Sequence, residues 1–270
     1  GFSHPATLIQ DARRHGTVVR PVDINHAGWR CGIEPDGAVR LGLRFVRGLR
    51  REAGMRIEAA RRQGPFCDLR GLQRRCRLRR DELDTLAALG ACDSLGLSRR
   101  AALWQVAALA DAGHGLLARC APSTDESPLA EMDAAGRTAA DYRHGGMTAG
   151  PHPLAHLRGR LRARGVVPAA SLAQCADGRR VRVAGVVITR QRPGTARGMC
   201  FVTLEDESGL ANVVITPDRF ERDRMTIVSS AALIVTGRLQ RRDGVVHLCG
   251  ESFHPLRAID RATPPAHDFR

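Results

Sequence analysis

Arginines that stand beside glycines are the residues of this chain best suited to chemistry, and the ligand they suit is phosphate. In the turn 47–51, one glycine is surrounded by three basic side chains. A glycine lets backbone N–H groups approach an oxyanion without hindrance, and guanidinium groups pair with phosphate oxygens. We therefore predict four phosphate-contacting residues: Arg47, Gly48, Arg50 and Arg51. The alternative, that Gly48 simply ends a helix, stays open, and it is favoured for a second such turn, Gly90-Ala91-Cys92.

Further arginines stand in two predicted loops near the end of the chain. The loop 190–198 contains one proline, two glycines and the basic residues Arg190, Arg192 and Arg197. A later loop contains Arg241 and Arg242 beside an Asp-Gly pair. Arginines in such loops can follow the phosphates of a single strand. We predict all five as backbone contacts, with a solvated hairpin tip as the alternative for the later loop.

Phe201 is the one aromatic residue that we predict to contact a ligand. It alternates with Cys200 and Val202 in a predicted strand. Since successive strand residues point to opposite faces, an inward aliphatic set turns Phe201 outward, where a nucleobase could stack on its ring. A bulge that returns Phe201 to the core is the alternative.

Carboxylates, histidines and cysteines give little support for a catalytic or metal centre. The run Glu205-Asp206-Glu207 precedes Ser208-Gly209, so we expect these carboxylates to shape a turn by accepting backbone hydrogen bonds. His152 and His156 lie four residues apart but lack an evident third ligand. The eight cysteines form no C-x-x-C pair. No nucleophile triad or phosphate-binding Walker loop is present, and we predict no catalytic and no metal-binding residue.

The charge of the whole chain is strongly basic. It has 270 residues and a formal charge of +14, and all 42 of its Lys and Arg residues are arginines. A GC-rich coding bias favours arginine, and a polyanionic partner favours a basic surface. Residues 44–80 hold thirteen arginines against three acidic residues, and this placement favours the polyanionic partner.

No window approaches the ~20 apolar residues of a membrane span, and the start does not resemble a signal peptide. We expect a cytoplasmic protein without a membrane partner, whose first residue lies inside a longer polypeptide.

Residues 39–112 are predicted to be helical. Three helices are expected, at 53–62, 81–89 and 99–112, each with an apolar stripe and a glycine or serine signal at one end. Short helices joined by glycine-centred turns are typical of tandem helix-hairpin-helix units. Such a region would position the arginines of the turn 47–51.

Residues 172–256 change to a period of two, which indicates strands. The expected strands are 180–190, 199–206, 211–215, 231–238 and 245–249, with a short helix at 218–223. Five strands with a helix before the fourth are the pattern of an oligonucleotide-binding (OB) barrel, whereas an immunoglobulin-like sandwich has about seven strands. The predicted fold class is therefore multidomain α + β, an all-α region followed by an all-β barrel.

Three other segments complete the predicted organisation. Residues 1–38, with a helix at 5–14 and a strand at 17–22, are too few to bury a core and belong to an incomplete domain. Residues 113–171 form a linker with a helix at 153–164. Residues 257–270 form a flexible tail.

Stretches from both halves of the chain carry a resemblance to a known family. They are His15–Asn25, Leu41–Leu49, Ala88–Ala91, Asp141–Arg143 and Arg190–Gly209. Together they resemble the C-family bacterial DNA polymerases, the polymerase III alpha-subunit, and above all its error-prone translesion branch. The resemblance extends over essentially the whole chain, as the C-terminal portion of such a polymerase.

The resemblance implies a separate role for each segment of the chain. Residues 1–38 would end the fingers domain, the helical region would contact primer–template duplex, and the barrel would lie near the single-stranded template. The family adds nucleotides with two Mg²⁺ ions held by palm aspartates, which would lie before residue 1, so this chain would have no cofactor and no activity alone. Translesion synthesis, DNA replication and DNA repair are implied, with other translesion or replisome proteins as partners. Direct binding to a sliding clamp is not expected, because Gln105–Leu109 lacks the aromatic residue of the clamp peptide.

Two other functions fit some of the same residues. A free-standing, non-enzymatic module that binds single-stranded nucleic acid would have the same domains, and the coding sequence before Gly1 would distinguish the two. An anticodon-binding accessory to a tRNA enzyme rests on the barrel alone, and competition between tRNA and single-stranded DNA would test it.

Overall fold

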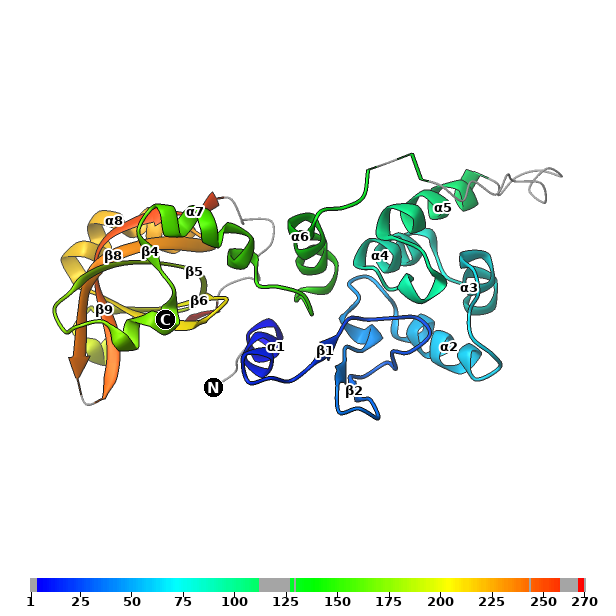
Figure 1. Cartoon of the computed structure of the whole chain (residues 1–270), viewed down its shortest axis with the longest axis horizontal. Coiled ribbons are helices and arrows are strands. Elements are labelled where there is room, and N and C mark those ends of the chain that lie inside the picture. The colour runs from blue at the N-terminus through cyan, green and yellow to red at the C-terminus, as the bar shows by residue number, and fades with distance from the viewer. Residues whose placement is uncertain (1–3, 112–126, 129, 243, 258–266, 270) are drawn as a thin grey trace. The chain divides into compact units, whose positions relative to one another are not determined.

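The computed structural model describes residues 4–111, 127–128, 130–242, 244–257 and 267–269 (Figure 1). The chain divides into two compact units. Residues 16–150 form the helical unit, and residues 1–15 together with residues 151–270 form the barrel unit.

Five α-helices lie in the described part of the helical unit. They are α2 (Arg51–Arg61), α3 (Leu69–Cys76), α4 (Arg80–Leu89), α5 (Arg99–Asp111) and α6 (Ala134–Gly145). The helices expected at 53–62, 81–89 and 99–112 are confirmed as α2, α4 and α5. In Figure 1, α2 lies against α3, and α4 lies against α5.

Two helices of this unit were not predicted. In α3, the Asp68 carboxylate accepts the Gly71 N–H at 2.6 Å and caps the first turn, while Leu69 and Leu72 are buried. In α6, the Asp133 carboxylate caps the helix by accepting the Gly136 N–H at 2.6 Å. Both segments have an acidic cap followed by apolar residues at helical spacing, but arginines or glycines obscure the pattern.

Residues 16–40 pack onto these helices. They contain the short strands β1 (Val19–Arg20), β2 (Gly32–Ile33) and β3 (Val39–Arg40), in the sheet order β1-β3-β2. The Ile24 N–H donates to the Ala91 carbonyl at 2.9 Å, and the Asn25 side chain bonds both backbone groups of Phe66. The predicted domain 1–38 is thus divided, because residues 16–38 lie in the helical unit and residues 5–14 lie in the barrel unit.

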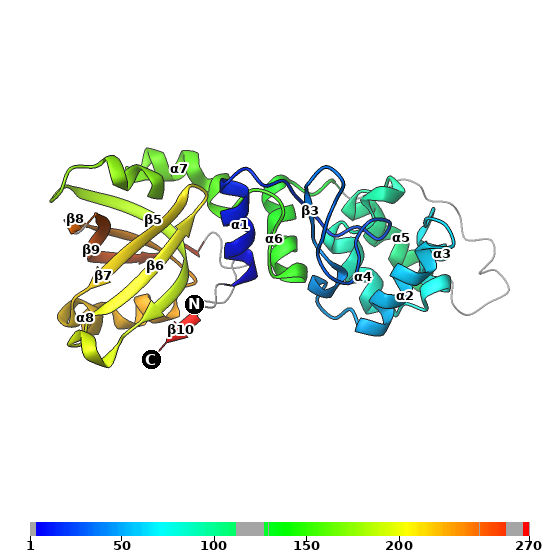
Figure 2. The same cartoon turned by 90° about the horizontal axis from the view of Figure 1, so that it is seen from below.

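Five strands close into the predicted barrel. They are β5 (Arg180–Gln191), β6 (Cys200–Asp206), β7 (Gly209–Ile215), β8 (Ala232–Arg242) and β9 (Val245–Pro255). The order is β5-β6-β7-β9-β8, and β8 pairs with β5 to close the barrel. All these pairings are antiparallel except β7–β9, which is parallel. Figure 2 shows β5, β6 and β7 side by side.

The barrel core follows from strand alternation. Its buried side chains include Val183 and Val187 of β5, Val202 and Leu204 of β6, and Val213 of β7. Helix α8 (Pro217–Ser229) lies between β7 and β8 in the chain and buries Phe220 and Ile227. It extends beyond the expected 218–223; its backbone leaves helical geometry at Asp223, where the expected helix ended.

Shorter elements surround the barrel. They are α1 (Pro5–Arg14), the 3₁₀ helix Pro153–Leu157, α7 (Arg158–Ala163), β4 (Val166–Val167), the 3₁₀ helix Ala169–Gln174 and β10 (His267–Phe269). The helix expected at 5–14 is confirmed, whereas the one expected at 153–164 is a 3₁₀ turn followed by α7. Strand β10 pairs in parallel with β5, so these three residues of the predicted flexible tail are ordered backbone. None of the helices in the described ranges is long and apolar enough to cross a membrane.

Candidate nucleic-acid interface

The turn before α2 has the backbone expected of a hairpin that approaches a phosphate. Gly48 is exposed and has a φ of +78°, and a Cβ placed there would meet no atom within 4 Å. Helix α2 begins three residues later, and no side chain caps its first turn. At this end of α2 the Arg50 N–H already donates to Glu82 Oε1 at 3.3 Å, and the first turn that follows has no side-chain cap, a feature typical of helix ends that bind anions.

Arg50 forms an ion pair within the helical unit. Its Nε and Nη2 donate to the two carboxylate oxygens of Glu82 at 2.8 and 3.0 Å. Glu82 is 1% exposed. Burial alone would raise the pKa of Glu82, but hydrogen bonds from Arg50 and from the backbone N–H of Arg79 outweigh it and lower this pKa to about 2. The Arg50 guanidinium therefore neutralises a buried carboxylate, and because its side chain is still 35% exposed, a phosphate contact by Arg50 stays a prediction.

Arg47 and Arg51 present their charge to solvent. Both side chains are exposed, and Arg47 also donates from Nη1 to the Arg143 carbonyl at 3.1 Å. In the described ranges Arg51 has no ion pair. Of the four residues predicted in this turn, the structure keeps Arg47, Gly48 and Arg51 available together.

The second glycine turn is a helix end. The Gly90 N–H donates to the Ala87 carbonyl and the Ala91 N–H to the Leu86 carbonyl, and Gly90 has a φ of +80°. These paired bonds form the Schellman motif that ends many helices. A Cβ at Gly90 would lie 2.7 Å from the Arg99 Nε, so the Arg99 side chain packs against this glycine.

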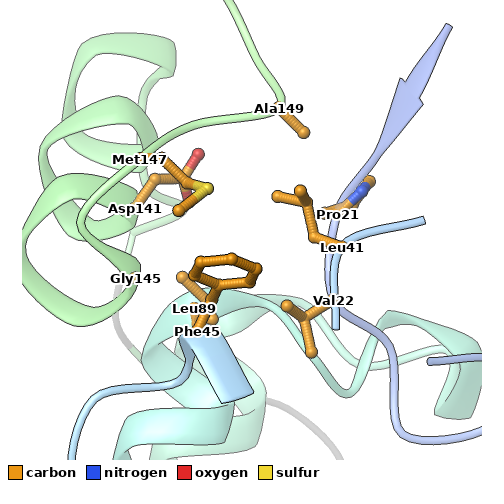
Figure 3. A pocket seen from close by; sticks show the side chains of 9 residues that line it. All are labelled: Pro21, Val22, Leu41, Phe45, Leu89, Asp141, Gly145, Met147 and Ala149. Carbon is orange, nitrogen blue, oxygen red and sulfur yellow. The ribbon is translucent and has the colours of Figure 1, made fainter. Parts of the chain in front are cut away.

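A small pocket of the helical unit offers little for chemistry. Its walls are mainly apolar, with Pro21, Leu41 and Phe45 facing Asp141 and Met147 (Figure 3). The Asp141 carboxylate is already engaged, since Arg99 Nη1 lies 2.8 Å from Oδ1 and the Thr148 hydroxyl donates to Oδ2 at 2.5 Å. Burial raises the pKa of Asp141, while Arg99 and Thr148 oppose this shift. The pocket thus holds a structural ion pair.

On the barrel, β6 places Phe201 as expected. Cys200, Val202 and Leu204 are buried, whereas Phe201 is 37% exposed. Its cross-strand neighbours are Gln191 on β5 and Val214 on β7. The ring therefore lies on the outer face of β6, and the predicted orientation is confirmed. Stacking of a nucleobase on this ring stays a prediction.

The loop after β5 keeps two of its three arginines available. Arg190 is only 8% exposed, and its guanidinium donates to the carbonyls of Ile227 and Ser230 at the end of α8. This burial corrects its predicted role, since Arg190 caps a helix from inside the barrel unit. Arg192 pairs with Glu221 at 3.1 Å and lies over the Phe220 ring, but its side chain is 40% exposed. Arg197 is exposed, with a left-handed backbone at φ +49°.

The later loop is only partly described. Arg241 is exposed, but its Nη2 donates to the Ala173 carbonyl at 2.7 Å and its backbone N–H to Asp177 at 2.9 Å. These bonds attach the end of β8 to the segment before β5. Arg242 is the last residue of β8, and its side chain lies outside the described part of the structure.

The acidic run at the β6–β7 turn behaves as predicted and does more. The Asp206 Oδ1 accepts the N–H groups of Ser208 and Gly209 at 2.8 and 3.1 Å, which shapes the turn. Asp206 Oδ2 accepts the Ala169 N–H at 2.8 Å and pairs with Arg158 at 2.9 Å. The carboxylates thus fasten neighbouring segments to the barrel, a role that sequence reasoning missed because its partners lie far away in the chain.

Glu205 binds α1 in the same way. Its carboxylate, 4% exposed, accepts a hydrogen bond from Arg14 Nη1 at 3.0 Å. Burial raises the pKa of Glu205 to about 7 and outweighs the opposing effect of Arg14.

In the described ranges no three His, Cys, Asp or Glu side chains are grouped to hold a metal ion. His152 is buried, and its Nδ1 accepts the Leu154 N–H at 3.2 Å, so it is structural.

Two protein-family models match this chain, one in each unit. Residues 16–102 match the family model described as "Helix-hairpin-helix motif", and residues 181–256 match the one described as "OB-fold nucleic acid binding domain". The predicted fold class is confirmed. Both matches agree with the helical unit and the barrel seen in the structure.

The chain is also similar to named proteins over nearly its whole length. It is 47% identical over 257 residues to an error-prone DNA polymerase of Azoarcus sp. (strain BH72), covering 92% of this chain and 24% of that protein. An error-prone DNA polymerase of Burkholderia pseudomallei (strain K96243) is 45% identical over 271 residues, covering 96% and 25%. The chain thus spans about a quarter of the length of these relatives. The resemblance to a C-terminal part of error-prone DNA polymerases is confirmed.

Solved structures give weaker matches. An asparaginyl-tRNA synthetase from Pyrococcus horikoshii is 23% identical with a TM-score of 0.25, covering 31% of this chain and 21% of that chain. An S. pombe Stn1-ten1 complex matches with 23% identity and the same TM-score, covering 29% and 59%. At these scores the likeness supports no inference.

Proposed function

We propose that this chain is the DNA-gripping part of an error-prone DNA-directed DNA polymerase. In this proposal the helical unit holds the primer–template duplex through the hairpin turn before α2. The barrel unit holds single-stranded template through the outer face of β6 and the loop that follows β5. The observation that carries the proposal is the pairing of a helix-hairpin-helix match with an OB-fold match in a chain 47% identical to an error-prone DNA polymerase over 92% of its length.

The electrostatics of the helical unit support a duplex contact. Arg47 and Arg51 are exposed around the open glycine turn, and the first turn of α2 has no side-chain cap. Phosphate oxygens would accept hydrogen bonds from these N–H groups and from guanidinium groups of the same turn. Such contacts follow the backbone and are independent of base sequence, as a polymerase requires.

The barrel surface supports a single-strand contact. Phe201 provides an exposed ring on β6, and Arg192 and Arg197 stand in the neighbouring loop. Bases would stack on the ring while the arginines follow the phosphates. Both features depend on backbone and stacking, so the proposed binding tolerates any base.

The remaining expectations belong to the same proposal. Nucleotide addition would take place in a palm domain outside this chain, where aspartates would hold Mg²⁺, and this chain would supply neither the cofactor nor the catalytic groups. We include in the proposal lesion bypass, DNA repair, a cytoplasmic location, other replisome partners and the assignment of residues 1–38 to the end of a fingers domain. The resemblance to error-prone DNA polymerases suggests them. Clamp binding is not proposed, since Gln105–Leu109 lies within α5.

Salt-dependent binding tests the proposal. We expect the full chain to bind labelled duplex and labelled single-stranded DNA, with log K falling steeply and linearly as log[NaCl] rises. Fluorescence anisotropy over a range of salt concentrations measures this slope, and primer-extension assays with the same chain should show no dNTP incorporation. A flat salt response would reject phosphate contact, and dNTP incorporation by this chain would reject the assignment of catalysis to a separate domain.

A further inference from the structure

The turn between α3 and α4 carries a second group of arginines, separate from the hairpin turn. Arg74, Arg77, Arg79 and Arg80 are all exposed, while Leu78 among them is 6% exposed and holds the turn against the core. Of the four, only Arg80 forms an ion pair in the described ranges, with Asp84 at 3.7 Å. These guanidinium groups therefore face solvent, and most of their positive charge has no acidic partner in the described ranges.

One buried carboxylate brings this turn beside the hairpin turn. Glu82, in the first turn of α4, accepts the Arg79 N–H at 2.9 Å and the Arg50 N–H at 3.3 Å. The residues just before α4 and just before α2 therefore meet at a single side chain. Arg80 and Arg51 are the first residues of the two helices, so each group includes an arginine that follows directly on a residue bonded by Glu82.

The end of α3 is also fixed in this arrangement. Arg56 of α2 donates from Nε to the Cys76 carbonyl at 2.7 Å, which ties the last residue of α3 to the middle of α2. Arg77 follows at once, with φ +48° and ψ +48°. This left-handed backbone favours glycine, and an arginine adopts it at a cost. The chain thus holds a basic side chain at a position where glycine would fit more easily.

We propose that Arg77, Arg79 and Arg80 contact a second phosphate position on the DNA duplex, beside the one contacted by Arg47 and Arg51. The inference rests on the proposed function and extends it, because the helical unit would then grip the backbone at two turns. Phosphate fits this surface because exposed guanidinium groups donate paired hydrogen bonds to its oxygens. Besides the buried Glu82, which is paired with Arg50, the acidic residues nearest to the two turns in the sequence are Glu52, Asp81 and Asp84, fewer than the exposed arginines of these turns.

Variants of the full chain can separate the two turns. Arg77→Gly removes one charge at a backbone position that suits glycine, and a triple variant adds Arg79→Gln and Arg80→Gln. The hairpin variant combines Arg47→Gln and Arg51→Gln.

A control with the same loss of three charges carries Arg160→Gln, Arg162→Gln and Arg164→Gln, which are exposed residues in and after α7. Thermal unfolding followed by tryptophan fluorescence reports the integrity of the helical unit, since Trp29 and Trp104 both belong to it.

The readout is the slope of log K against log[NaCl] for a labelled duplex. We expect the slope to become shallower by roughly one for Arg77→Gly and by roughly two to three for the triple variant, with melting temperatures close to that of the unaltered chain. The control should keep the slope of the unaltered chain. A triple variant that is folded and keeps the native slope, while the hairpin variant loses part of it, would overturn this inference alone. Failure of the unaltered chain to bind duplex would overturn the proposed function together with it.

Discussion

At the scale of single residues, Glu82 joins the starts of α2 and α4, where the proposed helical interface lies. It is buried, and it bonds Arg50 and the Arg79 N–H at the starts of α2 and α4. We expect Glu82→Gln to destabilise the helical unit by about 1.5 kcal/mol, since the neutral amide loses the charge-assisted hydrogen bonds that the carboxylate accepts from Arg50 and from the Arg79 N–H. Urea unfolding followed by tryptophan fluorescence measures this change. Asp84→Asn, at a half-exposed pair 3.7 Å apart, should cost less than about 0.5 kcal/mol. Equal effects of the two substitutions would contradict the role of Glu82.

The same residue predicts an acid dependence. The folded-state pKa of Glu82 is about 2 against an ordinary value of 4.5, so its contribution to stability is complete above about pH 4.5. The contribution is lost as the pH falls from there toward 2, because the unfolded chain binds the proton first. Urea midpoints measured by tryptophan fluorescence across this range should fall for the unaltered chain and fall less for Glu82→Gln. Parallel curves for the two proteins would show that another group titrates instead.

The orientation of Phe201 could be predicted from the sequence, whereas the partners of Arg50 and Arg190 could not. The outward direction of Phe201 followed from alternation, because the strand is regular at that position. The contacts of Arg50 and Arg190 could not be predicted from the sequence, because their partners lie more than thirty positions away. These partners are Glu82 and the carbonyl of Ile227. An arginine in a basic stretch resembles a ligand contact until its tertiary partner is known.

At the scale of elements, the end of α8 depends on a side chain from β5. Arg190 donates to the carbonyls of Ile227 and Ser230, which end that helix. We expect Arg190→Met to destabilise the barrel unit by about 2 kcal/mol, because buried carbonyls lose their donors. Thermal unfolding followed by far-UV circular dichroism measures this, with the tryptophan transition marking the helical unit separately. Arg192→Met, at a 40% exposed side chain, is the control and should change little. If Arg190→Met leaves the barrel transition in place, the capping role is wrong.

The ion pair between Arg14 of α1 and Glu205 of β6 should make the stability of the barrel unit depend on pH. The folded-state pKa of Glu205 is raised to about 7 by burial, against an ordinary value of 4.5. Between these two values the folded chain keeps a proton that the unfolded chain releases, so stability falls as the pH rises from about 4.5 to 7. Carboxyl-carbon NMR, with Glu205→Gln to assign the signal, should show one glutamate that titrates near neutrality. A spectrum in which every glutamate titrates below about pH 5 would contradict this account.

Elements with strong local signals were predictable and weakly marked ones were not. The five barrel strands and the helices α2, α4 and α5 carry clear periodicity between turn residues. Helix α3 was not predicted because arginines separate its apolar residues. Helix α6 was not predicted because alanines and glycines surround its buried Tyr142. In both, burial against other helices supplies the stability that local propensity lacks.

At the scale of the whole molecule, the proposed function rests on two basic surfaces, one in each unit. The formal charge of +14 spread over the chain would attract any polyanion, but only certain arginines are exposed beside an open turn or an exposed ring. Composition could indicate the class of partner. It could not indicate which arginines are structural, because that distinction depends on burial and on carbonyl or carboxylate partners.

The most direct test of this account compares two variants on two substrates. Phe201→Ala should weaken binding of the full chain to single-stranded DNA by about tenfold and leave duplex binding within about twofold. The combined Arg47→Gln and Arg51→Gln variant should do the reverse, weakening duplex binding while retaining single-strand binding. Equilibrium anisotropy at one fixed, low salt concentration measures all four affinities. If both variants weaken both substrates equally, or if the unaltered chain binds neither form of DNA, the account of two separate DNA-binding surfaces is contradicted.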